Sequence, residues 1–563
     1  MLFAVLAALI TVTYRMGSLP LLSPDEGRNA EVAREMKNSG AWLVPSYNQL
    51  PYLDKPAFYF KTVALSLSLL GDNEYGARMS SALFAAAVLF LAWRFTRHQC
   101  GSRPAALAVL VIATSPLFIS QARIVIFDIA LCLFVCLAVV SGYRAEQLAD
   151  PQRTRWLRLG AAAAGFATLV KGPVGFLLPI VVLSTYHATR RDWAGIRRLF
   201  RPLHILIFLA IVLPWFVGVS LQHPDFPDYG LVQESFKRFT TSQFHRGGPV
   251  YYYALVMPAT FFPWSLLIPG GVWFLTRNRS ALPEITRLCL CWCLAVVVFF
   301  SMSKSKLPGY ILSISVPFGI LVAQLLDAAL SRPDGTAGRI LRKTTTGLVT
   351  LMVVLTLGLI VAAPQTGLLP HPLPLKKVNL ADYSSAVIPV ATLFAIIAAI
   401  GSGGLMRRKS GLNLSSFALL PILLVVLGAG VFDVVFQKSS ARPIAERLSH
   451  LPKETGLVFY QCFPTGLPFY LRRTGTLITE TGGELTSNYA IYMLKRTESW
   501  PSPVVKPQDF DLWLGKQTGD LYLFFKSDRK ETAQALATRY QASLEELPNR
   551  FLGLPLPAKA RQR

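Results

Sequence analysis

The chain has 563 residues, of which 52% are hydrophobic and only 15% are charged. This balance excludes an ordinary soluble protein of this size and indicates an integral membrane protein. The formal net charge of +25 does not indicate nucleic-acid binding, because the basic residues gather in short connections between apolar segments. We therefore expect membrane lipids around the chain and no nucleic-acid partner.

Spanning a bilayer takes about 20 predominantly apolar residues. The first apolar segment lacks a basic leader and runs on without a convincing cleavage site, so we interpret it as an anchor helix and not a signal peptide. About thirteen candidate spans follow from the sequence, near residues 1–16, 76–96, 104–120, 125–143, 157–171, 173–187, 202–221, 254–275, 286–302, 308–330, 342–363, 386–405 and 414–436.

Basic residues crowd every second connection between these spans, and short cytoplasmic loops carry such an excess. The pattern predicts a cytoplasmic N-terminus, with the odd-numbered loops and the C-terminal tail on the outer side. The basic connections contain Arg94, Arg97 and Arg103; Arg144, Arg153, Arg155 and Arg158; Arg190, Arg191, Arg197 and Arg198; Arg277, Arg279 and Arg287; Arg332, Arg339, Arg342 and Lys343; and Arg407, Arg408 and Lys409.

The first outward loop, residues 17–75, contains a predicted surface helix from about Pro24 to Asn38 that ends at Gly40. Ser23, Pro24 and Glu26 fit a capping box with proline at the first helical position, so Asp25 and Glu26 could simply start a helix. A capped helix start would also fix both carboxylates at the membrane surface. We expect Glu26 to be mainly structural and Asp25 to be the catalytic candidate.

Ten ionisable residues are predicted at the outer membrane face, where such groups usually line a wet cavity or a functional site. A local ion pair could explain Arg123 and Asp128, and snorkelling to the interface could explain Lys171. Lysine and arginine together also suit a phosphate group, and the acids suit an acceptor or a base role. The ten are Asp25, Glu26, Asp54, Lys55, Arg123, Asp128, Lys171, Arg246, Lys304 and Lys306.

The apolar runs shorten after about residue 437. We expect a membrane domain at 1–436, with a second long outward loop at 222–253, and a soluble α/β domain at 437–563. Short apolar runs at 457–460, 490–494 and 521–525 predict strands, and residues 531–546 predict a helix. Cys462 is the only cysteine of this tail, so no disulfide is expected within it. No paired carboxylates there rival the membrane set, which favours a scaffolding or acceptor-positioning role.

An ordered set of motifs along the membrane region resembles the GT-C glycosyltransferases of the aminoarabinose transferase and protein O-mannosyltransferase superfamily. Each motif alone is weak, but their order is specific. The motifs are Ser23-Pro24-Asp25-Glu26-Gly27-Arg28, Ala30 to Met36, Gly40 to Pro45, Tyr52-Leu53-Asp54-Lys55-Pro56, Gly71 to Glu74, Arg123 with Asp128, Leu169 to Pro173, Arg238-Phe239 with His245-Arg246, and Lys304 to Leu312.

The resemblance implies thirteen membrane helices, a periplasmic soluble domain and a sugar donor carried on undecaprenyl phosphate. Asp25 would be the principal catalytic carboxylate and Asp128 the second acid of the cavity. Lys55 and Arg246 would hold the lipid phosphate, with Tyr310 and Lys171 beside them. Glu26, Asp54, Arg123, Lys304 and Lys306 would support the site. The sequence requires no cofactor, and the resemblance leaves open a divalent metal contacted by Asp54 and His245.

The expected activity is inverting transfer of 4-amino-4-deoxy-L-arabinose or a related sugar to lipid A or another envelope acceptor. The enzyme would be a monomer in the bacterial inner membrane, with its active site in the periplasm. A protein or glycan acceptor, as in an O-mannosyltransferase, remains an alternative. A lipid flippase is a second one, although its charges would be expected across the bilayer and not on one side.

Overall fold

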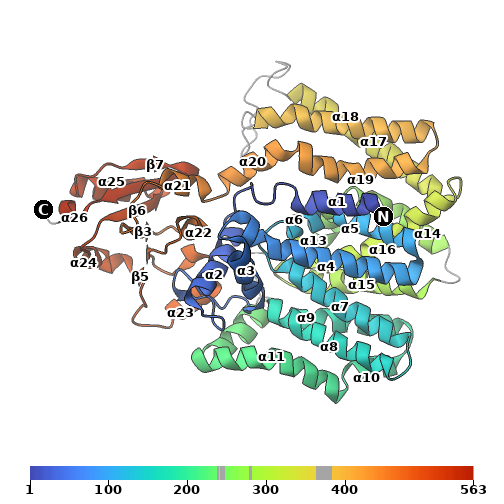
Figure 1. Ribbon diagram of the computed structural model, residues 1–563, viewed down its shortest axis with the longest axis horizontal. Coiled ribbons are helices and arrows are strands. Elements are labelled where there is room, and N and C mark those ends of the chain that lie inside the picture. Colours follow the sequence, from blue (N-terminus) through green and yellow to red (C-terminus); the bar gives the residue numbers. More distant parts are fainter. Residues whose placement is uncertain (238–239, 241–246, 278–281, 363–382, 562–563) are drawn as a thin grey trace.

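The computed structural model describes residues 1–237, 240, 247–277, 282–362 and 383–561. Figure 1 shows a bundle of long helices and, beyond one end of it, a smaller domain of strands and short helices that holds the C-terminus. The first loop of the chain, with α2 (Asp25–Ser39) and α3 (Phe58–Leu70), lies between these two parts.

The described part of the bundle contains eight helices that are long and apolar enough to cross a membrane, or up to ten if each of two bent pairs counts as one span. Its helices after α3 are α4 (Glu74–Cys100), α5 (Ser102–Ala113), α6 (Pro116–Ala122), α7 (Asp128–Glu146), α8 (Gln152–Lys171), α9 (Val174–Thr189), α10 (Trp193–Leu199), α11 (Pro202–Gln222), α13 (Tyr252–Thr260), α14 (Ile268–Arg277), α15 (Glu284–Met302), α16 (Ser315–Ser331), α17 (Thr336–Ala362), α18 (Ser384–Met406), α19 (Ser410–Leu427) and α20 (Ala429–Lys438).

Each of the thirteen expected spans contains a helix, but not all of them form one straight crossing. The first, α1 (Leu2–Thr13), has 12 residues and so measures about 18 Å at 1.5 Å per residue. The α5–α6 pair bends by 69° and the pair that begins with α13 bends by 113°. Pro116 and Pro263 stand at these breaks, as expected for a residue that lacks the backbone N–H a continuing helix needs.

In the described membrane part, three short irregular helices and one short ribbon connect or extend the long helices. A π-helix, η1 (Asp228–Lys237), follows α11 and carries part of the site. Two 3-10 helices, η2 (Trp264–Leu267) and η4 (Pro308–Ile314), lead directly into α14 and α16. A two-stranded ribbon of β1 (Ser46–Tyr47) and β2 (Leu50–Pro51) links α2 to α3.

Helix α2 is polar in sequence yet largely buried, because its charged residues have partners. Arg34 binds both carboxylate oxygens of Glu31 at 2.7 Å. Glu35 accepts hydrogen bonds from Ser46 and from the backbone N–H groups of residues 48 and 49. Buried charges are tolerated when they are paired in this way. The helix ends at Gly40, which has a left-handed φ of 68°, and both bounds of the predicted surface helix are confirmed within one residue.

The C-terminal domain is built on a six-stranded mixed sheet in the order β5-β4-β3-β6-β8-β7. The strands β3 to β6 are parallel, and β8 and β7 pair in an antiparallel manner. The strands are β3 (Gly456–Tyr460), β4 (Thr476–Ile478), β5 (Val504–Val505), β6 (Leu521–Lys526), β7 (Glu545–Leu547) and β8 (Phe551–Leu556). Its helices are α21 (Arg442–Arg447), α22 (Leu467–Leu471), η7 (Gly483–Leu485), α23 (Asn488–Leu494), η8 (Pro507–Asp509), α24 (Phe510–Gly515), η9 (Ser527–Arg529), α25 (Lys530–Arg539), η10 (Pro548–Arg550) and α26 (Ala558–Arg561).

Alternating side chains of β3 and β6 separate two cores, as the period of a strand requires. Val458, Leu523 and Phe525 pack with residues of α24 and α25. Phe459 and Phe524 belong instead to the core that continues into the helical bundle. The two parts of the molecule therefore share apolar packing.

Two predictions for this domain are wrong. Residues 490–494 form α23 and not a strand, since Ser487 accepts a hydrogen bond from the Ala490 N–H and caps a helix. The helix predicted at 531–546 stops at Arg539, because Gln541 takes a left-handed φ of 49° and the chain turns into β7. The domain boundary expected at 436–437 falls inside α20, two residues before its end.

Helix α2 and the C-terminal domain approach each other closely through two glycines. A Cβ atom at Gly27 would lie 2.6 Å from the Cα of Gly466. No side chain fits at that distance, so the pairing of these two glycines allows α2 to lie directly against the C-terminal domain. The start of α2 thus faces residues from the last quarter of the chain.

Candidate active site

Asp25 is the first residue of α2 and lies half exposed at the wall of a polar cavity. Its Oδ1 accepts a bond of 2.6 Å from Arg28. The second amino group of Arg28 donates to the backbone oxygen and the hydroxyl of Thr486, both at 2.9 Å. Burial alone would lower the pKa of Arg28, but Tyr52 and Asp25 raise it above its ordinary value. Arg28 therefore fixes Asp25 against the C-terminal domain.

Glu26 has a structural place, but it is not the predicted capping box. Its carboxylate binds the Nε and Nη2 atoms of Arg78 at 2.8 Å and accepts the backbone N–H groups of Leu22 and Val125. No side chain caps the start of α2, and the Ser23 N–H donates to the carbonyl of Ser439. The Glu26 carboxylate is therefore held by buried Arg78 and does not cap its own helix. The spacing of nearby residues cannot reveal a partner that lies 52 residues away.

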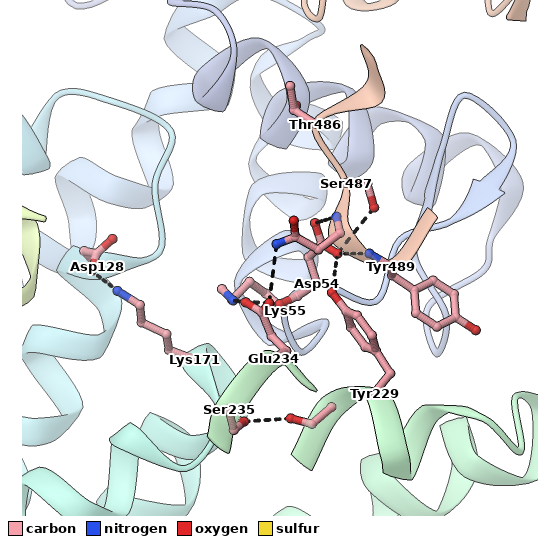
Figure 2. A network of polar contacts seen from close by, with 12 residues as sticks. Asp54, Lys55, Asp128, Lys171, Tyr229, Glu234, Ser235, Thr486, Ser487 and Tyr489 are labelled. Carbon is pink, nitrogen blue, oxygen red and sulfur yellow. Dashed lines mark hydrogen bonds and ion pairs between the residues drawn. The ribbon is translucent and has the colours of Figure 1, made fainter. Parts of the chain in front are cut away.

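Asp54 lies buried where the first loop meets α23 (Figure 2). Its Oδ1 accepts from the Tyr489 N–H at 2.6 Å, the Tyr229 hydroxyl at 2.8 Å and Ser487 at 3.3 Å, and its Oδ2 accepts from the Asn488 N–H at 3.0 Å. Burial raises the pKa of Asp54, and the charge of Glu234 raises it further.

These contacts bear on the metal that Asp54 and His245 could hold. Four donors surround the Asp54 carboxylate, and a cation would have to displace some of them. His245 and Arg246 both lie outside the described residues. The metal site therefore stays a prediction. Elsewhere in the described chain, Glu146, His187 and Asp192 could each offer a ligand atom, but Arg198 already binds both carboxylates, at 2.7 and 3.1 Å.

Lys55 and Lys171 each form an ion pair (Figure 2), and both line the same cavity. Lys55 binds Glu234 of η1 and also donates to the Asp54 carbonyl at 2.7 Å. Lys171 binds Asp128, the first residue of α7. All four side chains are nearly buried. A local ion pair with Arg123 could have explained Asp128, but the structure pairs Asp128 with a lysine from the end of α8 instead.

Tyr310 of η4 completes this group. The Lys171 ammonium lies 4.5 Å from the centre of the Tyr310 ring and 5.2 Å from that of Phe127. Cations at such distances are attracted by the negative face of an aromatic ring. Lys171 is thus held by a carboxylate and two rings and does not snorkel freely at the interface.

Among the described residues, the other cations predicted at the outer face lie elsewhere. Arg123 donates to the backbone oxygens of Thr11 and Tyr14, which are at the end of α1, at 3.0 and 2.6 Å. Lys306 is buried and donates to the backbone oxygens of Ser301 and Ser303, whereas Lys304 is exposed. Arg123 and Lys306 therefore stabilise turns of the backbone, and neither lines the cavity that holds Asp25.

Two cavities meet at the lysines. The reaction pocket, of about 80 Å³, is lined by Asp25, Arg28, Tyr52, Asp54, Lys55, Ile126, Phe127, Asp128, Lys171, Glu234, Leu307, Tyr310, Thr486 and Asn488. The apolar pocket, of about 370 Å³, is lined by Lys55, Lys171, Pro173, Val174, Leu177, Leu231, Glu234, Ser235, Phe299, Phe300, Ser303, Ser305 and Tyr310. Lys55, Lys171, Glu234 and Tyr310 belong to both. The molecule thus joins an acidic chamber to an apolar one through a pair of cations.

Sequence reasoning missed several residues of the reaction pocket. In the sequence, Glu234 is one of several acids in the second outward loop. The one indication of its role is that a buried Lys55 would need an acidic partner. Thr486 and Asn488 come from a domain with no catalytic pattern, so no signal in the sequence marks them. Arg28 is the last residue of the motif that begins at Ser23, but its role depends on Thr486, which is 458 residues away.

Comparison with known proteins gives matches along nearly the whole chain. Residues 54–217 match the family described as "Dolichyl-phosphate-mannose-protein mannosyltransferase". An "Undecaprenyl phosphate-alpha-4-amino-4-deoxy-L-arabinose arabinosyl transferase" of Erwinia tasmaniensis is 28% identical over 538 residues, which is 93% of each chain. The protein of the same name from Edwardsiella ictaluri is 28% identical over 90% of each chain.

The fold is also similar to solved structures. The crystal structure of ArnT from Cupriavidus metallidurans bound to undecaprenyl phosphate matches with a TM-score of 0.84 and 27% identity, covering 99% of this chain and 98% of that one. The same protein in the apo state matches with a TM-score of 0.82. The helical bundle, the ordered motifs and these likenesses agree. The chain belongs to the superfamily of GT-C glycosyltransferases that contains the aminoarabinose transferases and the protein O-mannosyltransferases.

Proposed function

We propose that this enzyme transfers 4-amino-4-deoxy-L-arabinose, or a closely related sugar, from undecaprenyl phosphate to lipid A or a related envelope acceptor. The observation that carries the proposal is the junction of the two pockets at Lys55 and Lys171. A polyprenyl-phosphate sugar has three parts of matching chemistry: an apolar chain, an anionic phosphate and a polar sugar. The names of the relatives in Erwinia and Edwardsiella support this donor and this sugar.

The donor would lie across both pockets. Phe299, Phe300 and Leu177 offer an apolar surface to the polyprenyl chain. Lys55 and Lys171 are point charges suited to the phosphate, and Arg246 is proposed as a third cation. The sugar would then occupy the reaction pocket, within the wall formed by Asp25 and Asp128.

The cations also serve the reaction. In a transfer with inversion, an acceptor oxygen attacks the anomeric carbon from the face opposite the phosphate. The new carbon–oxygen bond forms as the old one breaks, and undecaprenyl phosphate leaves with the bonding electron pair. Lysines fixed beside the leaving oxygen stabilise the charge that grows there. Their existing pairing with Glu234 and Asp128 keeps them in place within a nearly buried site.

Asp25 is the proposed group on the acceptor side. If the acceptor is an ionised phosphate, its oxygen is already nucleophilic and Asp25 has only to orient it. If the acceptor is a hydroxyl, Asp25 takes its proton as a general base. The bond from Arg28 holds one carboxylate oxygen, and the half-exposed side chain leaves room for the acceptor to approach the other.

A protein acceptor is the alternative, and the match of residues 54–217 to a protein mannosyltransferase family favours it. The same pockets would then serve a different sugar and a serine or threonine hydroxyl. In both cases we propose that the active site and the C-terminal domain face the periplasm, with the N-terminus in the cytoplasm, and that the enzyme works as a monomer.

Mass spectrometry of lipid A and of envelope glycans from cells with and without this protein tests the proposal. We expect an aminopentose on lipid A phosphate only where the protein is present. Asp25→Asn should remove this modification at normal protein levels, whereas Asp509→Asn, an exposed acid of the C-terminal domain, should retain it. Unchanged lipid A together with a mass difference in glycosylated protein would establish the alternative acceptor.

A further inference from the structure

A third cavity, of about 470 Å³, lies between the start of α2, the end of α20 and the C-terminal domain. We call it the junction pocket. Its lining residues are Ser23, Pro24, Lys438, Ser439, Ser440, Ala441, Ile444, Phe463, Pro464, Thr465, Gly483, Glu484, Thr486, Lys526, Asn549 and Phe551. None of them lies between residues 25 and 437, so the junction pocket shares no residue with the apolar pocket.

The lining of this cavity suits a polar, anionic ligand. Lys438 and Lys526 bring two cations against one acid, Glu484. Several hydroxyl groups accompany them. Among these, the Thr465 hydroxyl is buried and has no hydrogen-bond partner in the part of the chain that the structure describes. A buried hydroxyl without a partner costs free energy, so its presence in a cavity wall indicates a ligand that supplies one.

The junction pocket also borders the reaction pocket. Thr486 lines both cavities, and Ser23 and Pro24 directly precede Asp25. Arg28 binds Thr486 on one side and Asp25 on the other. A ligand seated in the junction pocket would therefore reach Asp25 past the start of α2, from a direction that the apolar pocket does not occupy.

Its position relative to the membrane fits a lipid-anchored ligand. Lys438 is the last residue of α20, where the helical bundle ends and the C-terminal domain begins (Figure 1). A head group that projects from the bilayer surface would meet Lys438 first and the hydroxyl-lined interior beyond it. The donor, by contrast, would enter between η1, α9 and α15.

We propose that the junction pocket binds the phosphorylated sugar head group of the acceptor and presents it to Asp25. This inference rests on the proposed function and adds where its second substrate binds. The Lys438 and Lys526 ammonium groups pair with a phosphate, as lysine does elsewhere. The hydroxyls of Thr465 and its neighbours bind the sugar. The C-terminal domain thereby selects the acceptor, while the bundle holds the donor.

The first test separates the two substrates kinetically. Initial rates of the full-length enzyme are measured while lipid A and the lipid-linked donor are varied in turn. The double variant Lys438→Ala/Lys526→Ala should raise the KM for lipid A at least tenfold and leave the KM for the donor unchanged. Thr465→Val should raise the lipid A KM a few-fold. The control Lys453→Ala/Lys495→Ala removes two exposed lysines outside the three pockets and should change neither constant.

Direct binding provides a readout that does not depend on turnover. The probe is the glucosamine disaccharide bisphosphate of lipid A without its acyl chains, titrated calorimetrically into the wild-type full chain. Binding should weaken at least tenfold in the lysine double variant, be restored in Lys438→Arg/Lys526→Arg, and be weak for the dephosphorylated disaccharide. Equal affinity of the wild type and the double variant for the probe, or an unchanged lipid A KM, would overturn the proposal.

The two measurements also distinguish this inference from the proposed function. If the wild type transfers no sugar to lipid A yet binds the bisphosphate through the two lysines, the proposed acceptor is wrong and the anionic-sugar pocket stands. If the wild type transfers sugar to lipid A and the double variant does so with the same KM, the acceptor is right and the pocket is refuted.

Discussion

Asp54→Asn tests whether the Asp54 carboxylate holds the C-terminal domain against the reaction pocket. The substitution keeps the size of the side chain but replaces one acceptor oxygen with an NH2 group. With the amide oxygen directed at the three donors on Oδ1, the NH2 group would face the Asn488 N–H. One charged hydrogen bond is lost, and a buried N–H is left opposite another donor.

The magnitude follows from two opposing effects. A hydrogen bond to a charged group contributes about 1.5–3 kcal/mol, and a buried unsatisfied donor costs about 1–3 kcal/mol. In the opposite direction, the substitution removes a buried negative charge. Burial and the nearby charge of Glu234 make that charge unfavourable, as the raised pKa of Asp54 indicates. We therefore expect a net loss of about 2 kcal/mol in the stability of this contact, or about 30-fold in the local opening equilibrium.

Hydrogen exchange of the full chain measures this opening. The backbone amides of Asn488 and Tyr489 should exchange about 30-fold faster in Asp54→Asn at 1.4 kcal/mol per tenfold, while the amides of β6 keep their rates. Glu480→Gln is the matched control, because Glu480 is an exposed acid of the same domain whose bond to Gln461 is local. Unchanged exchange at residues 488 and 489 would refute the idea that Asp54 holds α23 in place.

Three further outcomes are expected. Glu26→Gln breaks a nearly fully buried ion pair with its arginine, so the protein should lose about 3–5 kcal/mol of stability, seen as a lower unfolding temperature in detergent. Lys171→Met should weaken binding of polyprenyl phosphate at least tenfold in a titration, and it leaves Asp128 without its lysine; unchanged affinity would remove Lys171 from the donor site. Cysteine introduced at exposed Ser449 should react with an impermeant reagent in intact spheroplasts, and cysteine at Ser331 only after permeabilisation; the reverse pattern would invert the topology.

The sequence predicted the membrane part well, because long apolar runs have few alternatives to helices in a bilayer. It was less successful where a structure depends on distant partners. The apolar run at 490–494 has the length and composition of a strand, yet a serine cap makes it a helix. Charge patterning predicted that Lys55, Asp128 and Lys171 share one face of the membrane, and the structure brings them to one cavity.

The pairings within that cavity were beyond local reasoning. Arg123, five positions away, was one possible partner of Asp128, but the observed partner is Lys171, which lies 43 residues along the chain. The carboxylate of Glu26 was assigned to its own helix start, but Arg78 reaches it from α4. Ion pairs between helices depend on how the helices pack, which no single segment encodes. The chemical character of the site could be predicted from residue types, whereas the ion pairs and hydrogen bonds between its residues could not.

The contact of Arg28 with Thr486 also has a consequence for how the enzyme is made. The segments that carry Asp25, Lys55 and Asp128 leave the ribosome long before Thr486 and Asn488, which line the reaction pocket. A nascent chain in which all the membrane helices have been inserted would still have an open site, because one wall arrives only with the last quarter of the polypeptide. We therefore expect activity to begin only after the C-terminal domain has folded against the bundle, and a prematurely terminated chain to reside in the membrane without consuming its lipid-linked sugar.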